Sequence, residues 1–131
     1  MVVFATSKEK TVDSPIVVPT ENVAAAEATG KKLRHVVLFK FKETATAKDI
    51  KAIEDAFRAL PSKIPSIKDF EWGINNSPEK HDKGFTHCFL LTFDSEAGRD
   101  AYLPHPAHKA FGKVLGPHME DVHVIDYWAG E

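Results

Sequence analysis

Residues 34–42, Arg34-His35-Val36-Val37-Leu38-Phe39-Lys40-Phe41-Lys42, predict the strand around which the rest of the chain is arranged. Large side chains recur at every second position, which is typical of a β-strand with one face on a core. One side of this strand carries His35, Val37, Phe39 and Phe41, and the other carries Val36 and Leu38. Because both sides are largely apolar, we expect both faces of the sheet to be covered.

The remaining elements follow from periodicity and turn residues. Apolar residues spaced three and four apart predict helices over 46–60 and 106–115, and a shorter helix that ends at Tyr102. Thr46 and Asp49 predict the N-terminal cap of the first helix. Alternation predicts three more strands, over 67–74, 85–93 and 122–128. The order β-α-β-β-α-β is that of the α+β ferredoxin-like fold, a four-stranded antiparallel sheet with helices on one face.

The second face of such a sheet must meet water, a ligand or another sheet. The third strand, like the first, is apolar on both sides, since Cys88 and Leu90 alternate with Phe89 and Leu91. An uncovered apolar sheet of this size would favour aggregation of a monomer. We therefore expect a homodimer in which two copies bury their sheet faces against each other.

Length, charge and cysteine content limit the number of domains, the kinds of partner and the location of the protein. The 131 residues divide into an N-terminal extension over 1–31, either mobile or wrapped around a partner subunit, and one domain over 32–131. A net charge of −2 with no basic stripe argues against nucleic acid, and no apolar run approaches the roughly 20 residues that span a membrane. Cys88 is the only cysteine, which favours a reducing compartment, so a cytoplasmic location is expected, with a processed export signal as the alternative.

The segment Tyr102-Leu103-Pro104-His105-Pro106-Ala107-His108 is the first candidate for a functional site. Two imidazoles and a phenol handle protons near neutral pH, and two prolines restrict the backbone between them. With Pro106 as the first helical residue, His105 lies near the helix cap and His108 lies in the first turn. The positive end of the helix dipole there favours a neutral imidazole, which suits His108 as a base, with Tyr102 as the acid or orienting group. The alternative is that His105 and His108 only cap an interrupted helix.

Three further residues are candidates to line a pocket. His35 and His87 lie on neighbouring strands, on the same sides as large apolar residues, and Trp72 could wall a pocket for an apolar ligand. The alternative for each histidine is a core residue with both nitrogens hydrogen-bonded. His105 and His108 with His87 could also hold a metal, but the segment has no acidic residue at a ligand spacing. We therefore expect no metal and no cofactor.

Residues 33–128 resemble the stress-responsive α/β-barrel (Dabb) domain family of dimeric ferredoxin-like proteins. The likeness rests on 35–42, on Ile64-Pro65-Ser66-Ile67, on Trp72-Gly73 and on Gly84-Phe85-Thr86-His87. Its most specific parts are Tyr102-Leu103-Pro104-His105-Pro106-Ala107-His108 and the closing Asp126-Tyr127-Trp128.

The resemblance implies a homodimer whose two sheets form a barrel with a small-molecule pocket, a link to stress response, and no assigned reaction. One plant branch of the family holds polyketide cyclases, which close a linear poly-β-keto thioester by aldol condensation. Their acid/base pair matches Tyr102 and His108, so a cyclase or isomerase is the alternative function, acting on a small apolar or carbonyl ligand. A monooxygenase, with or without haem, is a further alternative that rests on fold analogy alone.

Overall fold

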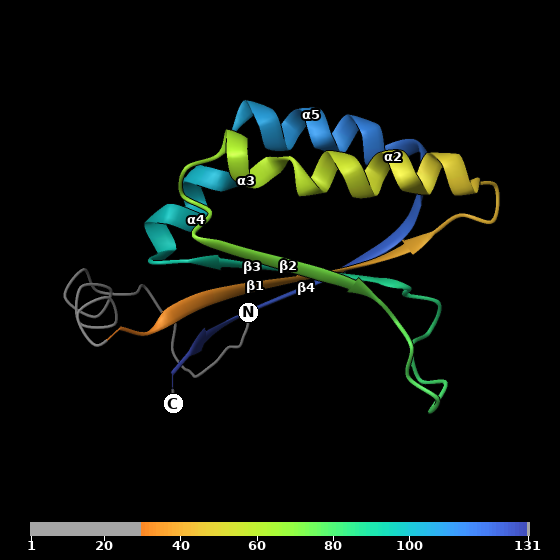
Figure 1. Ribbon diagram of the computed structural model, residues 1–131, viewed down its shortest axis with the longest axis horizontal. Coiled ribbons are helices and arrows are strands. Elements are labelled where there is room, and N and C mark those ends of the chain that lie inside the picture. Colours follow the sequence, from red (N-terminus) through yellow and green to blue (C-terminus); the bar gives the residue numbers. More distant parts are fainter. Residues whose placement is uncertain (1–29, 131) are drawn as a thin grey trace. The chain divides into compact units, whose positions relative to one another are not determined.

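The computed structural model describes residues 30–130, so the predicted extension lies outside the described residues except for positions 30 and 31. The strands are β1 (Lys32–Phe41), β2 (Asp69–Ile74), β3 (His87–Phe93) and β4 (Met119–Ala129). The helices are α2 (Ala47–Arg58), α3 (Leu60–Lys63), α4 (Glu96–Tyr102) and α5 (Pro106–Leu115), and a 3₁₀ turn over Gly116–His118 leads into β4 (Figure 1).

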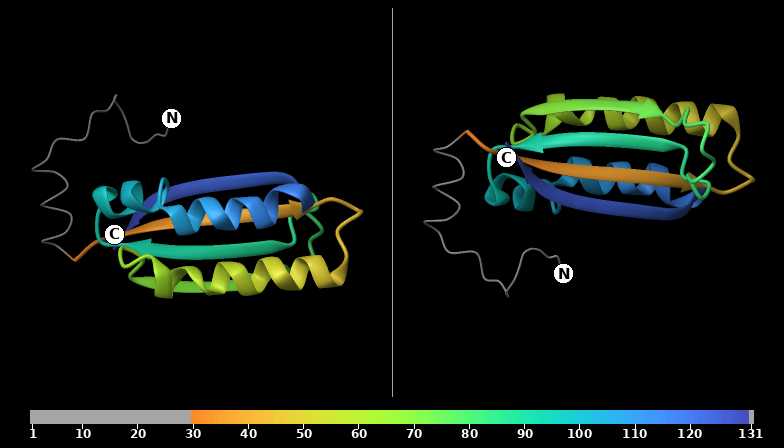
Figure 2. Two further views of the ribbon diagram at one scale, coloured as in Figure 1. Left: turned by 90° about the horizontal axis from the view of Figure 1, so that it is seen from above. Right: turned by 90° about the horizontal axis from the view of Figure 1, so that it is seen from below.

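The four strands form one antiparallel sheet in the order β2-β3-β1-β4. The helices lie over one face of this sheet, and the two turned views in Figure 2 show that the other face carries none. In the strand order, β3 lies beside β1 and β1 lies beside β4, so neighbours in the sheet are not all consecutive in sequence. The predicted ferredoxin-like fold has this arrangement. The predicted fold is confirmed.

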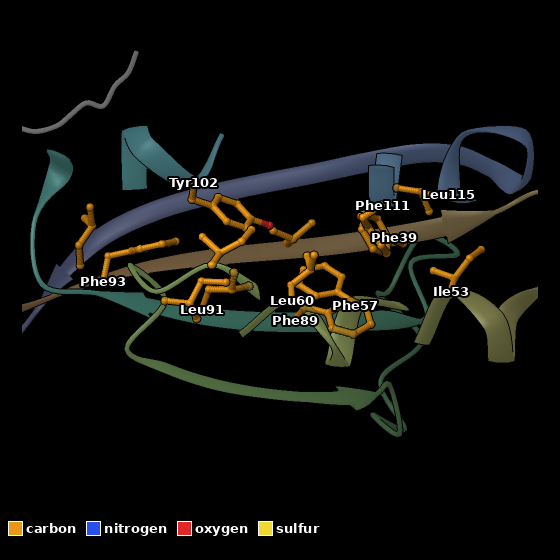
Figure 3. Packing of buried hydrophobic residues seen from close by; sticks show 14 residues of the cluster. Phe39, Ile53, Phe57, Leu60, Phe89, Leu91, Phe93, Tyr102, Phe111 and Leu115 are labelled. Atoms are coloured by element: carbon orange, nitrogen blue, oxygen red, sulfur yellow. The ribbon is translucent and has the colours of Figure 1, made fainter. Parts of the chain in front are cut away.

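The core lies between the sheet and the helices and is rich in phenylalanine (Figure 3). Phe57 from α2 lies nearly parallel to Phe89 from β3, with ring centroids 4.1 Å apart. Phe39 from β1 and Phe111 from α5 pack around this pair. Each fully buried ring stabilises the fold by about 1.5–3 kcal/mol relative to an exposed one, so this cluster holds α2 and α5 on the sheet.

Local sequence sets where α2 begins and where it gives way to α3. Thr46 accepts a hydrogen bond from the Asp49 amide, and the Asp49 carboxylate accepts one from the Thr46 amide, which confirms the predicted cap. The helix ends at Arg58, before the predicted residue 60, and the separate short helix α3 follows. The proline at position 61 suits the first turn of α3, because that turn needs no donor from its amide.

The face without helices is apolar at its centre. Along β1, the buried residues alternate with half-buried ones, and Val36 and Leu38 belong to the latter. Ile125 lies opposite Val36 and Tyr127 lies opposite Arg34, and both β4 side chains are about half exposed. This open face, formed by Val36, Leu38, Leu90 and Ile125, is the surface for which the sequence predicted a cover. Within residues 30–130, no helix is long and apolar enough to cross a membrane.

Candidate functional site

The junction between α4 and α5 places Tyr102 inside the molecule. Tyr102 is the last residue of α4, and its side chain is only 1% exposed. Its ring lies 4.4 Å from the His108 ring and 5.7 Å from the His35 ring, measured between centroids. Figure 3 shows the hydroxyl directed toward the middle of the buried cluster. The fold therefore brings together three of the predicted site residues, from β1, α4 and α5.

The helix start at Pro106 orients the two histidines of the segment differently. His105 is the N-cap of α5, and its Nδ1 accepts a hydrogen bond of 3.0 Å from the Ala107 amide. His108, two residues after Pro106, donates from Nδ1 to the Leu103 carbonyl oxygen at 2.9 Å. A carbonyl oxygen can only accept, so Nδ1 of His108 carries a proton and Nε2 of the neutral ring carries the lone pair. The predicted positions of both histidines in the helix are confirmed.

Burial determines the state of the Tyr102 hydroxyl. Burial raises the pKa of Tyr102 well above its ordinary range, because the surrounding apolar side chains disfavour a phenolate. Tyr102 therefore stays protonated and can donate a hydrogen bond at physiological pH. Within residues 30–130, the close neighbours of Tyr102 are the rings of His35, Phe93 and His108.

His35 is held by the ion pair of Asp126 and Arg99, two residues that were not predicted as part of the site. Its Nδ1 lies 2.7 Å from Oδ1 of Asp126 on β4, and Oδ2 of Asp126 accepts a 3.0 Å hydrogen bond from Arg99 on α4. Burial raises the pKa of the Asp126 carboxyl, but the His35 hydrogen bond and the Arg99 charge outweigh burial and lower it overall. One signal was present: Asp126 shares a face with apolar Val124 and Trp128 in the alternation of the last strand.

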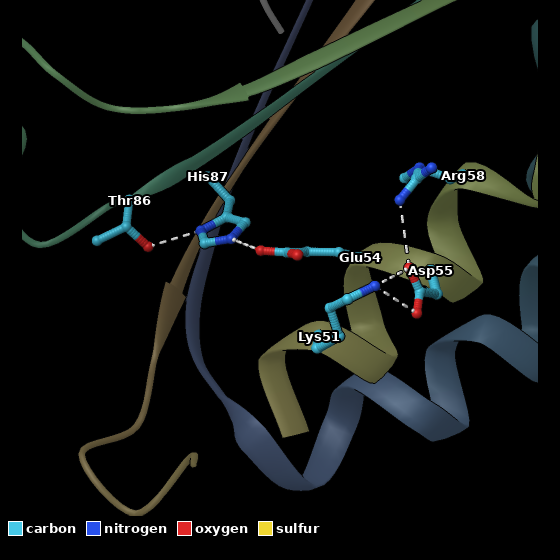
Figure 4. A network of polar contacts seen from close by, with 6 residues as sticks. All are labelled: Lys51, Glu54, Asp55, Arg58, Thr86 and His87. Atoms are coloured by element: carbon cyan, nitrogen blue, oxygen red, sulfur yellow. Dashed lines mark hydrogen bonds and ion pairs between the residues drawn. The ribbon is translucent and has the colours of Figure 1, made fainter. Parts of the chain in front are cut away.

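His87 lies in a separate group at the other end of the covered face (Figure 4). Its Nε2 lies 2.8 Å from a Glu54 carboxylate oxygen, and its Nδ1 lies 2.9 Å from the Thr86 hydroxyl. Trp72 stacks on the imidazole, with 6.0 Å between ring centroids and 17° between planes. His87 and Trp72, each a candidate to line a pocket, thus lie against each other, and within residues 30–130 neither is in ring contact with Tyr102.

Two cavities border the open face of the sheet. The larger, of about 530 Å³, lies where the loop between β2 and β3 begins and ends, and it is lined by residues that include Ile74, His81, His87, Cys88 and His123. The other, of about 320 Å³, lies near Arg34, Glu71 and Tyr127. Neither is lined by Tyr102 or His108, so the place of these two residues, and of His35, His105 and Trp72, in a ligand pocket stays a prediction. Within residues 30–130, no three His, Cys, Asp or Glu side chains are grouped to hold a metal ion.

Sheet order, helix placement and the apolar open face define an α+β ferredoxin-like domain of the kind found in dimeric proteins. The chain belongs to the stress responsive A/B barrel domain family, whose model matches residues 33–129. It is 35% identical to stress-response A/B barrel domain-containing protein HS1 of Arabidopsis thaliana over 101 residues, 77% of this chain and 92% of that protein. It is 30% identical to olivetolic acid cyclase of Cannabis sativa, over 72% of this chain and 94% of the cyclase.

Solved structures show the same fold. A hydroxynitrile lyase from Passiflora edulis matches with a TM-score of 0.71 and 29% identity, over 76% of this chain and 94% of the lyase. A dimeric protein of ferredoxin-like fold from Bacteroides fragilis matches with a TM-score of 0.61 and 29% identity, over 73% of this chain and 94% of that protein. Relatives of this chain thus include two proteins named as enzymes with different reactions.

Proposed function

We propose that this protein binds a small carbonyl compound beside Tyr102 and His108 and transfers a proton on it. The observation that supports this most is the hydrogen bond from His108 Nδ1 to the Leu103 carbonyl, which leaves the lone pair on Nε2. The likeness to a cyclase and a hydroxynitrile lyase supports a reaction of this class. A link to stress response and a cytoplasmic location remain proposals that rest on the family and on cysteine content.

The two side chains have complementary roles in this proposal. Nε2 of His108 removes a proton from the carbon next to the carbonyl, and the electron pair of the broken C–H bond moves toward the carbonyl oxygen. The Tyr102 hydroxyl donates a hydrogen bond to that oxygen as its negative charge develops. Positioned acid–base groups typically contribute about 10²–10⁴-fold to a rate, which makes each residue's share measurable.

Two probes test the reaction with the full chain. A linear poly-β-keto thioester is assayed for cyclised product by mass spectrometry, and mandelonitrile is assayed for benzaldehyde by absorbance. With mandelonitrile, Nε2 of His108 takes the hydroxyl proton instead, the C–O electrons form the carbonyl, and the C–C bond breaks with cyanide as the leaving group. We expect turnover of one probe, a loss on the order of 100-fold or more in His108→Ala, and a similar loss in Tyr102→Phe. His118→Gln is the control, because His118 lies in the turn after the other end of α5 and pairs with Asp49 in the first turn of α2, so its loss should leave turnover unchanged. Equal turnover in His108→Ala and the unchanged protein would refute the proposal.

A second candidate is ligand binding without turnover. It is favoured by the cavity of about 530 Å³, which is lined by neither Tyr102 nor His108. Native mass spectrometry of the protein purified from its host should then show a retained small molecule that His108→Ala still binds. Retention in the unchanged protein together with its loss in His108→Ala would instead assign that ligand to the Tyr102–His108 site.

We also propose that the protein is a homodimer through its open face. The support is the apolar centre of this face and the dimeric state named for neighbours of the same fold. Ile125→Lys places a charge at the centre of the face, whereas Val114→Lys alters an equally apolar exposed residue on α5. Sedimentation should give a dimer mass for the unchanged protein and for Val114→Lys, and a monomer mass for Ile125→Lys. A monomer mass for the unchanged protein at micromolar concentration would overturn this proposal.

A further inference from the structure

We propose that Arg99 and Asp126 are positioning residues of the Tyr102–His108 site, which fix the proton of His35 on Nδ1 and leave its Nε2 as a second acceptor beside Tyr102. This inference rests on the proposed function, because it adds a group to the same site. It concerns two residues that lie outside the segment from Tyr102 to His108.

The two hydrogen bonds of the Asp126 carboxylate have a defined direction. Arg99 has only donors, so its NH1 donates to Oδ2 of Asp126 across 3.0 Å. The ionised carboxylate has only acceptors, so Oδ1 accepts from Nδ1 of His35 across 2.7 Å. A neutral His35 with a proton on Nδ1 carries its lone pair on Nε2. The hydrogen bond that His35 makes to a side chain within residues 30–130 uses Nδ1, and none is found there for Nε2.

Strands β1 and β4 and helix α4 place the three side chains near one another. His35 lies opposite Asp126 in the register of β1 and β4, which sets the imidazole and carboxylate side by side. Arg99 precedes Tyr102 by three residues, about one helical turn on α4. The bond from Arg99 to Asp126 therefore ties the end of α4 to β4 at the level of His35. On the same helix, the Tyr102 ring contacts both the His35 ring and the His108 ring.

Placing these side chains away from water has a cost in free energy. The side chains of Arg99 and Asp126 are only 22% and 23% exposed, and that of His35 is 7% exposed. Well-packed apolar residues are often as stabilising as buried ion pairs, or more so, because removing charges from water is costly. Stability alone is therefore a weak reason for placing the Arg99–Asp126 ion pair beside His35. A defined proton position on His35 is a use that apolar residues could not serve.

Nuclear magnetic resonance of the full chain labelled with ¹⁵N-histidine tests the proposal without a substrate. Spectra recorded well above the ordinary histidine pKa show which ring nitrogen of His35 carries the proton. The variants are Asp126→Asn, Arg99→Met and the double variant. Asp100→Asn is the control, since Asp100 accepts from Nε of Arg99 but does not contact His35.

We expect the unchanged protein and Asp100→Asn to carry the His35 proton on Nδ1. In Asp126→Asn, Arg99 still requires an acceptor, so the amide oxygen turns toward Arg99 and the amide NH₂ faces Nδ1 of His35. That nitrogen must then accept, and the proton moves to Nε2. In the double variant the oxygen is free to turn toward His35, and the proton returns to Nδ1. A merely structural role would change stability without this switch and return.

The outcomes separate the two proposals. A His35 proton on Nε2 in the unchanged protein would overturn the inference, and this measurement holds even if Asp126→Asn does not fold. A proton that stays on Nδ1 in a folded Asp126→Asn would overturn it as well. With a probe that His108→Ala fails to convert, Asp126→Asn should lose on the order of 100-fold in turnover, and the double variant should recover part of it. If no probe is converted by the unchanged protein while the switch occurs, the proposed function fails and the positioning remains.

Discussion

Residues 30–130 contain two pairs of a buried histidine and a carboxylate, and they differ in which ring nitrogen of the histidine remains free. His87 is bound at both ring nitrogens, by Glu54 and by Thr86, and Trp72 stacks on its face. His35 is bound at Nδ1 by Asp126, and its second nitrogen has no partner in the described part of the chain. The two imidazoles are almost equally buried, so burial does not distinguish them.

The difference shows which property marks a buried histidine as available for chemistry. An imidazole with both nitrogens satisfied acts as part of the core, because any proton transfer would break a bond that burial makes costly to lose. An imidazole with one free nitrogen beside a protonated phenol can accept from a ligand. The carboxylates also differ, since Asp126 is bound by Arg99 as well as by His35, whereas Glu54 is bound by His87 alone among the described residues.

The largest expected effect is on stability when each histidine is removed. His87→Ala leaves Glu54 buried without a partner and should lower the free energy of unfolding by about 3 kcal/mol. His35→Ala leaves Asp126 paired with Arg99, so we expect a smaller loss, about 1–2 kcal/mol. The two substitutions delete the same atoms at nearly equal burial, which makes them matched controls. Urea unfolding measures both, and an equal loss would remove the distinction between the two pairs.

Alkaline pH should reveal the burial of Tyr102. Its pKa in the folded protein is raised above the ordinary value of 10.0, so the folded state holds the phenolic proton more tightly than the unfolded state. The resulting stability is fully present below pH 10 and decreases as the pH rises beyond it, by up to about 1.4 kcal/mol per pH unit. Tyr102→Phe lacks this group and should show a smaller decrease. Parallel curves of unfolding free energy against pH for the two proteins would contradict the buried phenol.

Acid pH should reveal the Asp126 pair with the opposite sign. The pKa of Asp126 is lowered in the folded protein, so its contribution to stability is present above the ordinary value of 3.8. That contribution is lost as the pH falls through the lowered pKa. We expect Asp126→Asn to show a shallower decrease in unfolding free energy between neutral and acid pH than the unchanged protein. Chemical unfolding at a series of pH values provides the comparison, and an identical slope would argue against an ionised Asp126.

The smallest expected effect concerns the second nitrogen of His87. Thr86→Val removes the hydroxyl that lies 2.9 Å from Nδ1 and preserves the shape of the side chain. Because position 86 is exposed, water can replace the lost partner, and the cost should stay within about 1 kcal/mol. A loss as large as that of His87→Ala would show that Thr86, rather than Glu54, anchors the imidazole.

Part of the candidate site could be predicted because it depends on local sequence. Proline favours the first turn of a helix, so Pro106 placed His105 at the cap and His108 in the first turn. The partners of His35 and His87 could not be found this way, since Asp126 is 91 residues from His35 and Glu54 is 33 residues from His87. Periodicity identifies apolar faces, and it gives no weight to a carboxylate on such a face.

The sequence alone determined the order of strands and helices and the face that each one buries, because these follow from side-chain periods of two and 3.6 along the chain. It also determined the two-sided apolar character of the sheet. Tertiary structure decided which nitrogen of each histidine is occupied, where α2 gives way to α3, and that β4 begins at Met119 rather than at 122. These features depend on strand register and on packing between distant segments. A hydrogen bond forms only within a few ångströms, and side-chain periodicity along the chain does not specify which distant atoms come that close.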